Sequence, residues 1–269
     1  MDNFVLEKSK EIRRLTMECI ASIGVGHVGG CLSITDLLTV LYYEKMNVDP
    51  KNPKMEGRDR LVVSKGHAGP AVYAALCSKG YFPKEELLTL NRFGTKLPSH
   101  CDMNLTTGID MTAGSLGQGF SCSVGIAIGS QICGDNATIY TVIGDGESQE
   151  GQIWEAAMFA HQKKLGNLIA FLDNNKMQID GMTSDINEMY DPVGKWNSFG
   201  WHVQEIDGHD LDAISAAIDN AKEVHDKPSM VVMNTIKGKG VSFVEEILSA
   251  NHNMPISAEQ LEVALKELA

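Results

Sequence analysis

The sequence lacks any long hydrophobic run. No stretch approaches the ~18 consecutive apolar residues that a membrane-spanning helix needs. The first residues, MDNFVLEKSKEIRRL, carry charges where a signal peptide has its apolar core. We therefore expect no membrane association and a cytoplasmic location. The apolar fraction of 43% in a chain of 269 residues is still enough to build a buried core.

Basic residues and paired cysteines are also scarce. The 23 Lys and Arg residues are outnumbered by 35 Asp and Glu residues, and the resulting net charge of −12 argues against nucleic-acid binding. The six cysteines include no CxxC pair and are expected to be free thiols. Cys31 and Cys101 each lie near a histidine, but neither has a base and an orienting group at a recognisable spacing for nucleophilic catalysis. An anionic ligand stays possible, because a bound divalent cation supplies positive charge locally.

Strand-like and helix-like patterns alternate along the chain. Strands are expected at 60–64, 139–143, 168–172, 202–206 and 229–234, and helices at 5–23, 34–43, 70–77, 83–90, 116–133, 149–163 and 211–224. Ser33 and Asp210 are expected to be N-caps, and Ser257 begins a capping box before a C-terminal helix. This alternation predicts an α/β fold, a parallel sheet with helices on both faces. With no linker or repeat in sight, we expect residues 1–269 to form one domain with a mobile C-terminal extension from about residue 240.

The strongest functional pattern is the pair of motifs GDGESQEGQ and NNKMQIDG, each of which follows a predicted strand. Parallel sheets bind ligands at the carboxyl ends of their strands. The Asp145 carboxylate, the Asn175 amide oxygen and a backbone carbonyl just beyond it could there hold one hard cation, such as Mg²⁺ or Ca²⁺. Gly144 and Gly146 have no Cβ and so let a diphosphate approach the backbone. In this stretch the sequence resembles the thiamine-diphosphate (ThDP) enzymes.

Four histidines extend that resemblance to nearly the whole chain. They lie in the segments GHVGG, SKGHA, LPSH and ANHNMP, and together with GSLGQG and TIKGKG they follow the order found in the N-terminal half of transketolases. The chain is similar to the N-terminal subunit of a split transketolase. The resemblance implies the diphosphate-domain fold of ThDP enzymes. It also implies a ThDP- and Mg²⁺-dependent transfer of a two-carbon ketol unit from a ketose phosphate to an aldose phosphate.

The resemblance also implies roles for individual residues. The metal ligands would be the side chains of Asp145 and Asn175 and the backbone carbonyl of Met177, with Ca²⁺ or Mn²⁺ able to replace Mg²⁺. The residues expected to bind the cofactor are His67, Gly114, Leu116, Gly144, Gly146, Glu147, Asn175, Ile236 and His252. The catalytic residues would be His27 and His100, which face the substrate, and Glu150, which reaches across a subunit interface.

Two departures and several alternatives accompany this interpretation. Val28 follows His27 where the family usually has proline, and Asn253 follows His252 where glycine is more common. A subunit related to 1-deoxyxylulose-5-phosphate synthase or to 2-oxo-acid dehydrogenases would share GDG…NN, but would lack this set of histidines. A non-catalytic scaffold or regulatory paralogue is a further alternative. A Rossmann dehydrogenase is disfavoured, because no G-x-G-x-x-G opens a helix with an acidic residue about 20 positions later.

The resemblance ends before the second domain of full-length transketolases. That domain binds the aminopyrimidine ring of ThDP and carries the glutamate that activates the cofactor. The groups that clamp the sugar phosphate also lie outside the part that this chain matches. We therefore expect a C-terminal partner subunit to complete the active site in an α₂β₂ assembly.

Overall fold

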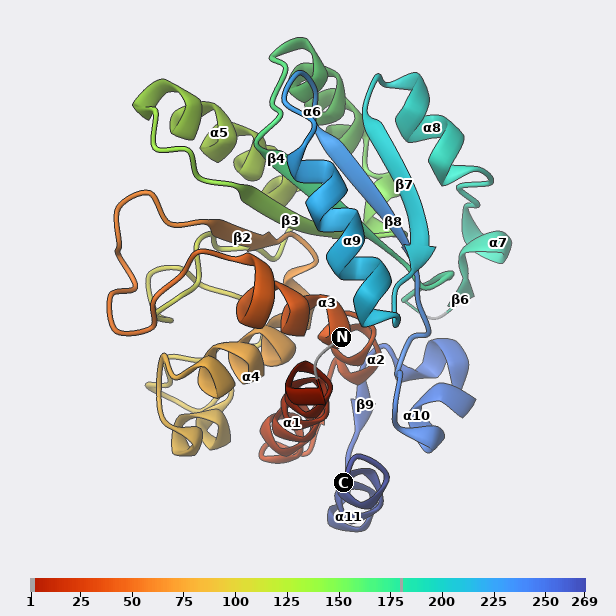
Figure 1. Cartoon of the computed structure of the whole chain (residues 1–269). Coiled ribbons are helices and arrows are strands. Elements are labelled where there is room, and N and C mark those ends of the chain that lie inside the picture. Colours follow the sequence, from red (N-terminus) through yellow and green to blue (C-terminus); the bar gives the residue numbers. More distant parts are fainter. Residues whose placement is uncertain (1–2, 180) are drawn as a thin grey trace.

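A parallel five-stranded sheet forms the centre of the computed structural model, which describes residues 3–179 and 181–269 (Figure 1). Its strand order is β2-β3-β4-β8-β7, and every neighbouring pair is parallel. The sheet strands are β2 (Arg60–Val63), β3 (Ile139–Gly144), β4 (Leu168–Asn174), β7 (His202–Asp207) and β8 (Ser229–Asn234). Two small antiparallel pairs join β1 (Val25–Gly26) to β9 (Met254–Pro255) and β5 (Met177–Gln178) to β6 (Gly181–Met182). All five predicted sheet strands are confirmed.

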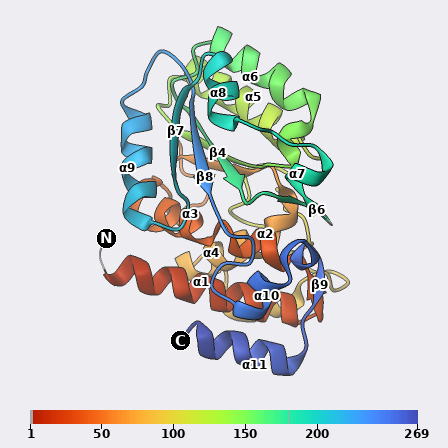
Figure 2. The same ribbon diagram turned by 90° about the vertical axis from the view of Figure 1, so that its right-hand side faces the viewer.

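Helices cover both faces of this sheet, as predicted from the alternating pattern (Figure 2). They are α1 (Asn3–Ala21), α2 (Val28–Leu32), α3 (Thr35–Val40), α4 (Gly69–Lys79), α5 (Gln118–Cys133), α6 (Gly151–Gln162), α7 (Thr183–Ile186), α8 (Pro192–Ser198), α9 (Leu211–Lys222), α10 (Ser242–Glu246) and α11 (Ala258–Glu267). Short 3₁₀ turns lie at Gly66–Ala68, Lys84–Thr89, Glu147–Gln149 and Leu248–Asn251, and a π-helical turn at Leu41–Lys45. Within the described residues, no helix combines the length and the apolar character needed to cross a membrane.

Alternate residues of each strand enter two separate hydrophobic cores. Tyr140 and Val142 of β3 pack with α1, α3, α4 and α9 on one face. Ile139 and Ile143 of the same strand pack with α5, α6 and α8 on the other face. Both faces of the strand are thus buried, and this is why parallel strands are continuously apolar in sequence.

Several local predictions were wrong at the level of caps and turns. Ser33 is not an N-cap: it ends α2, and its hydroxyl donates to the Asp173 carboxylate at 2.7 Å. The segment expected to be one helix at 34–43 is α3 followed by the π-helical turn. The helix expected at 83–90 is a 3₁₀ turn, and the segment after β8 contains α10 and a further 3₁₀ turn. Asp210 and Ser257 do cap α9 and α11, as predicted.

The C-terminal segment packs against the N-terminal helix. In both views α11 lies beside α1 (Figures 1 and 2). Arg14 Nη1 donates to the Leu268 carbonyl at 2.5 Å, and Arg13 Nε donates to the Lys239 carbonyl at 3.1 Å. Ala264 and Leu268 are buried in the core that contains α1. The residues beyond about 240 are therefore docked on the body of the structure.

Candidate functional site

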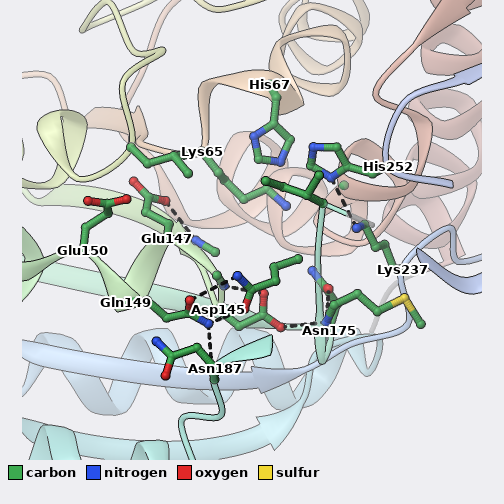
Figure 3. A pocket seen from close by; sticks show the side chains of 17 residues that line it. Lys65, His67, Asp145, Glu147, Gln149, Glu150, Asn175, Asn187, Lys237 and His252 are labelled. Atoms are coloured by element: carbon green, nitrogen blue, oxygen red, sulfur yellow. Dashed lines mark hydrogen bonds between the residues drawn. The ribbon is translucent and has the colours of Figure 1, made fainter. Parts of the chain in front are cut away.

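A cavity of about 360 Å³ lies at the carboxyl ends of β3 and β4. This is the edge of a parallel sheet at which ligands are expected to bind. Figure 3 shows Asp145 and Asn175 on one side of this cavity and His67 and His252 on the other. The described residues that line it are Gly30, Lys65, His67, Leu116, Gly144, Asp145, Gly146, Glu147, Gln149, Glu150, Asn175, Met177, Gln178, Ile179, Asn187, Lys237 and His252.

The side-chain oxygens of Asp145 and Asn175 converge on one point. Both accept a hydrogen bond from the backbone N–H of Met177, Asp145 Oδ2 at 3.2 Å and Asn175 Oδ1 at 3.1 Å. The other Asp145 oxygen, Oδ1, accepts from the N–H of Gly146 at 2.8 Å. Burial and the nearby Asp173 carboxylate raise the pKa of Asp145 to about 7. Two oxygens that are held together in a buried place suit a divalent cation, whose positive charge would stabilise the ionised Asp145 carboxylate.

The glycines of the GDG turn let other chain segments come close to it. A Cβ on Gly146 would lie 2.6 Å from the Gln178 Cβ, so any larger residue would push the β5–β6 segment away. Gly30, across the cavity, is similarly confined, since its Cβ would lie 3.1 Å from His67 Nε2. Because Gly30 and Gly146 have no side chains, the backbone itself forms these parts of the cavity wall. That is the arrangement by which a diphosphate can be bound through main-chain groups.

Glu147 forms buried hydrogen bonds that its sequence motif does not predict. Its buried carboxylate accepts from the backbone N–H of Gly117 at 2.9 Å, from that of Gly144 at 3.0 Å and from the Ser64 hydroxyl. Burial raises its pKa, and these hydrogen bonds oppose that change. Glu147 thus connects the GDG turn to the loop that carries Leu116.

The structure brings together the four histidines that sequence motifs singled out. The His27 ring lies with its centroid 5.4 Å from that of His67, 5.6 Å from that of His100 and 5.2 Å from that of His252. His67 and His252 are themselves 5.1 Å apart. They come from segments that are distant in sequence, so this cluster is formed only by the fold.

All four histidines are held toward the neutral form. Burial lowers the pKa of His27 and of His100. Burial and the Lys65 ammonium lower the pKa of His67 well below its usual value. For His252, burial and the Lys237 ammonium lower the pKa to about 4. Imidazoles that are neutral near pH 7 can accept or donate hydrogen bonds without placing a repelling positive charge beside Lys65 and Lys237.

Two buried lysines were missed by sequence reasoning. Lys237 is 3% exposed, and its Nζ lies 3.3 Å from His252 Nδ1. Lys65 is 1% exposed and donates to the fully buried Asp173 carboxylate at 2.5 Å. Both lysines lie within the motifs TIKGKG and SKGHA, in which the glycines and the histidine are the more conspicuous residues. They supply the cationic side of a site for an anionic ligand in a chain that is acidic overall.

Four of the proposed site residues lie outside the lining of this cavity. His100 and Gly114 line a neighbouring open cavity, although His100 keeps its ring contact with His27. His27 joins the site through the histidine cluster. Ile236 is 44% exposed, and its backbone N–H donates to His209 Nε2 at 2.8 Å. Its exposed side chain and that of Glu150 at the rim leave this side of the site open to solvent.

Comparison with known proteins agrees with the site geometry. Residues 6–268 match the family described as "Transketolase, thiamine diphosphate binding domain". A 6-deoxy-6-sulfo-D-fructose transketolase subunit, SqwG, from Clostridium sp. (strain MSTE9) is 60% identical over 257 residues, which are 96% of this chain and 93% of that protein. An apulose-4-phosphate transketolase subunit from Phocaeicola vulgatus is 38% identical and is covered over 95% of its length by the whole of this chain.

Solved structures show the same likeness in three dimensions. A transketolase mutant from Pichia stipitis superposes with a TM-score of 0.92 at 33% identity, over 100% of this chain and 41% of that one. The family model and the two subunits confirm the predicted family, fold and activity class of a transketolase subunit. The chain belongs to the transketolase family, as a thiamine-diphosphate-binding subunit.

Proposed function

We propose that this chain holds the diphosphate and the divalent metal of ThDP in a transketolase that is completed by a second subunit. The observation that carries the proposal is the convergence of Asp145 Oδ2 and Asn175 Oδ1 beside Met177. Few protein ligands are needed for Mg²⁺, because it usually keeps water and phosphate oxygens in its shell. We assign the two side chains and the Met177 carbonyl to Mg²⁺, which Ca²⁺ or Mn²⁺ could replace.

The opposite wall of the cavity suits the diphosphate. His252 lies there in contact with both His67 and Lys237, and the glycines Gly30 and Gly146 add no side chains to the walls. We assign these groups to the phosphate oxygens, with Gly144 and Glu147 shaping the turn below them. Leu116, Gly114 and Ile236 would pack against the rings of the cofactor. ThDP, when bound, supplies the carbon nucleophile and the electron sink for cleavage beside a carbonyl.

The chain's own chemistry in this reaction is proton transfer and orientation. We assign His27 and His100 to the hydroxyl and carbonyl oxygens of the sugar, because neither lines the cavity assigned to the diphosphate, their rings lie 5.6 Å apart, and their lowered pKa values keep them neutral. A neutral imidazole can take a proton from a sugar hydroxyl and return it to a carbonyl oxygen. Glu150 is exposed at the rim, where a residue that contacts a partner subunit has to be.

The sugar that this enzyme uses is suggested by its relatives. The transfer moves two carbons from a ketose to an aldose, so a six-carbon donor leaves a four-carbon aldose. The relative named for 6-deoxy-6-sulfo-D-fructose is 60% identical to this chain, and that named for apulose 4-phosphate is 38% identical. We therefore propose 6-deoxy-6-sulfo-D-fructose as the first donor to assay, beside sugar phosphates.

A partner subunit follows from the same relatives, which are themselves named as subunits. We propose that residues 1–269 act as one diphosphate-binding domain, that a C-terminal subunit supplies the pyrimidine-binding domain, and that two copies of each form an α₂β₂ complex in the cytoplasm. The exposed Ile236 and Glu150 at the mouth of the site support an interface there. A non-catalytic paralogue is the alternative, and the intact set Asp145, Asn175 and His67 disfavours it.

The experiment is to mix the purified chain with its co-purifying subunit, ThDP and Mg²⁺ and to measure ketol transfer from each donor. We expect transfer that disappears when either subunit, ThDP or the metal is left out. Binding of ThDP without any ketol transfer from these donors would favour the non-catalytic alternative. A chain that binds no ThDP under any of these conditions would contradict the proposal.

A further inference from the structure

The Asp173 carboxylate lies at the centre of a hydrogen-bond network that no motif marked. It stands near the end of β4 and is completely buried. Its Oδ2 accepts from Lys65 Nζ at 2.5 Å, from Ser33 Oγ at 2.7 Å and from Asn175 Nδ2 at 2.9 Å. Its Oδ1 accepts from Thr235 Oγ1 at 2.5 Å. Four donors thus meet on one carboxylate.

Each of these donors belongs to a different segment of the cofactor site. Ser33 ends the loop and short helix that His27 begins, and Lys65 stands two residues before His67. Thr235 immediately precedes Ile236 after β8, and Asn175 is itself a proposed metal ligand. The segments come together only in the fold, so one buried group that bonds to all four can fix their relative positions.

The contact with Asn175 has a direct consequence for metal binding. An amide side chain presents either its oxygen or its NH₂ group to a cation, and only the oxygen is a ligand. Because Asp173 accepts from Nδ2, the Oδ1 atom points the other way, toward the Met177 N–H and the Asp145 carboxylate. Partners behind a metal ligand orient it in this manner and are commonly as important as the ligand's own chemistry.

Lys65 makes the burial of this carboxylate possible. An unpaired charge in the interior is strongly unfavourable, whereas a paired and fully hydrogen-bonded one is tolerated. The Lys65 ammonium is 1% exposed and also lies 3.5 Å from Ser33 Oγ. It lines the cavity together with Asn175. The ion pair therefore lies directly beneath the cavity, and a rearrangement of the pair would change the position of cavity-lining groups.

We propose that Asp173 is a positioning residue that orients Asn175 toward the metal and ties the loops of His27, His67 and Ile236 to the same point. The proposal rests on the proposed function, since it assumes that Asn175 is a metal ligand. Asp173 itself touches neither cofactor nor substrate. Its effect is expected in metal and ThDP affinity, and not only in the stability of the fold.

The test is the affinity for Mn²⁺ in the presence of ThDP, measured by electron paramagnetic resonance on the full chain with the subunit that co-purifies with it. Asp173→Asn is expected to weaken Mn²⁺ binding about 10- to 100-fold, as loss of an outer partner of a metal ligand does. Thr235→Val, which removes a single hydroxyl donor, is expected to weaken it about 3- to 10-fold. Thr235→Ser keeps the hydroxyl and should restore wild-type affinity.

Asp59→Asn is the matched control. Asp59 is also a buried aspartate, but it accepts from the backbone N–H groups of Asn47 and Thr138 at the other end of β2. The Asp59→Asn variant should have a lower unfolding temperature and an unchanged affinity for Mn²⁺. If Asp173→Asn fails to fold, the comparison of Thr235→Val with Thr235→Ser decides. Wild-type Mn²⁺ affinity in Thr235→Val, or in folded Asp173→Asn, would overturn the positioning role alone. A wild-type complex that binds no Mn²⁺ with ThDP would overturn the metal site as well.

Discussion

The backbone N–H of Ile236 donates a hydrogen bond to His209 Nε2 at 2.8 Å. The other ring nitrogen of His209, Nδ1, lies 2.9 Å from Asp36 Oδ2. Since Nε2 accepts a hydrogen bond from the backbone, Nδ1 carries the hydrogen that points to the carboxylate, and this fixes the tautomer of the ring. Asp36 is held in turn by Arg13 Nη1, which donates to its Oδ1 at 2.9 Å. A chain of polar contacts thus runs from α1 to the segment that follows β8.

This relationship predicts that His209 supports cofactor binding from a distance. In His209→Leu the Ile236 N–H loses its acceptor, and the segment that is proposed to flank the cofactor loses one anchor. We expect ThDP affinity to fall about 3- to 10-fold, the size of one net hydrogen bond, with the fold retained. Isothermal titration with ThDP and Mg²⁺ measures this. The exposed His225→Leu serves as the control, and equal affinities in the two variants would refute the anchoring role.

Asp145 is predicted to be essential for metal-dependent binding but not for folding. Burial and the nearby Asp173 carboxylate raise the pKa of Asp145, so truncation removes an unfavourably buried group together with a proposed metal ligand. Asp145→Ala should therefore weaken Mg²⁺-dependent ThDP binding by at least about 100-fold, the upper end for loss of a group behind a metal ligand. The unfolding temperature of the cofactor-free chain should stay close to the wild-type value. Unchanged ThDP affinity in the variant would contradict the metal role.

The lowered pKa of His252 predicts a defined pH dependence of stability. Its folded pKa of about 4 lies below the value of 6.5 for a free histidine, so the unfolded chain binds the extra proton first. This histidine therefore lowers the free energy of unfolding as the pH falls from about 6.5 to about 4. Replacing it with Asn should flatten the fall in unfolding temperature over this window, relative to the cofactor-free wild type.

The carboxylates of the site also contribute to the pH dependence of the free energy of unfolding. Lys65 and hydrogen bonds lower the pKa of Asp173 despite its burial, so its loss of stability comes below about pH 4, the ordinary aspartate range. Burial raises the pKa values of Asp145 and Glu147, which act in the opposite direction to His252. The difference between wild type and His252→Asn removes these shared contributions. A difference that is constant from pH 7.5 to 4.5 would contradict the lowered pKa of His252.

His27 is predicted to affect turnover more than cofactor binding. It contacts the rings of His67, His100 and His252 but does not line the main cavity. If it moves a proton to or from the sugar, His27→Ala should lower kcat by about 100-fold or more. ThDP affinity should change by less than about 3-fold, because one hydrogen bond at most is affected. Steady-state kinetics and titration on the same preparation separate the two, and a loss confined to ThDP binding would reassign this histidine to the cofactor.

The sequence predicted the parts of the fold that depend on local pattern. The five sheet strands are continuous apolar runs because both of their faces are buried, and the caps Asp210 and Ser257 depend on neighbouring residues only. The cap at Ser33 failed because its hydroxyl bonds to Asp173, which is far away in the chain. The short helices α7 and α8, between β6 and β7, were not foreseen either.

The candidate site was foreseen where a motif combines spacing with chemistry. Asp145 and Asn175 follow adjacent strands and do meet, and the four histidines do form one cluster. The Lys65–Asp173 pair escaped notice because an ion pair between distant residues leaves no periodic trace in the sequence. The hydrogen bonds of Glu147 with Ser64 and Gly117 were not predicted for the same reason.

The most direct test of the whole account is the composition of the complex that a tagged copy of this chain brings out of its native cells with ThDP and Mg²⁺ present. We predict a second subunit of roughly 30–35 kDa, a size typical of one or two domains, in equal amount, and ketol transfer by the complex but not by this chain alone. Recovery of the chain as a homo-oligomer that transfers ketol groups unaided would contradict the shared active site.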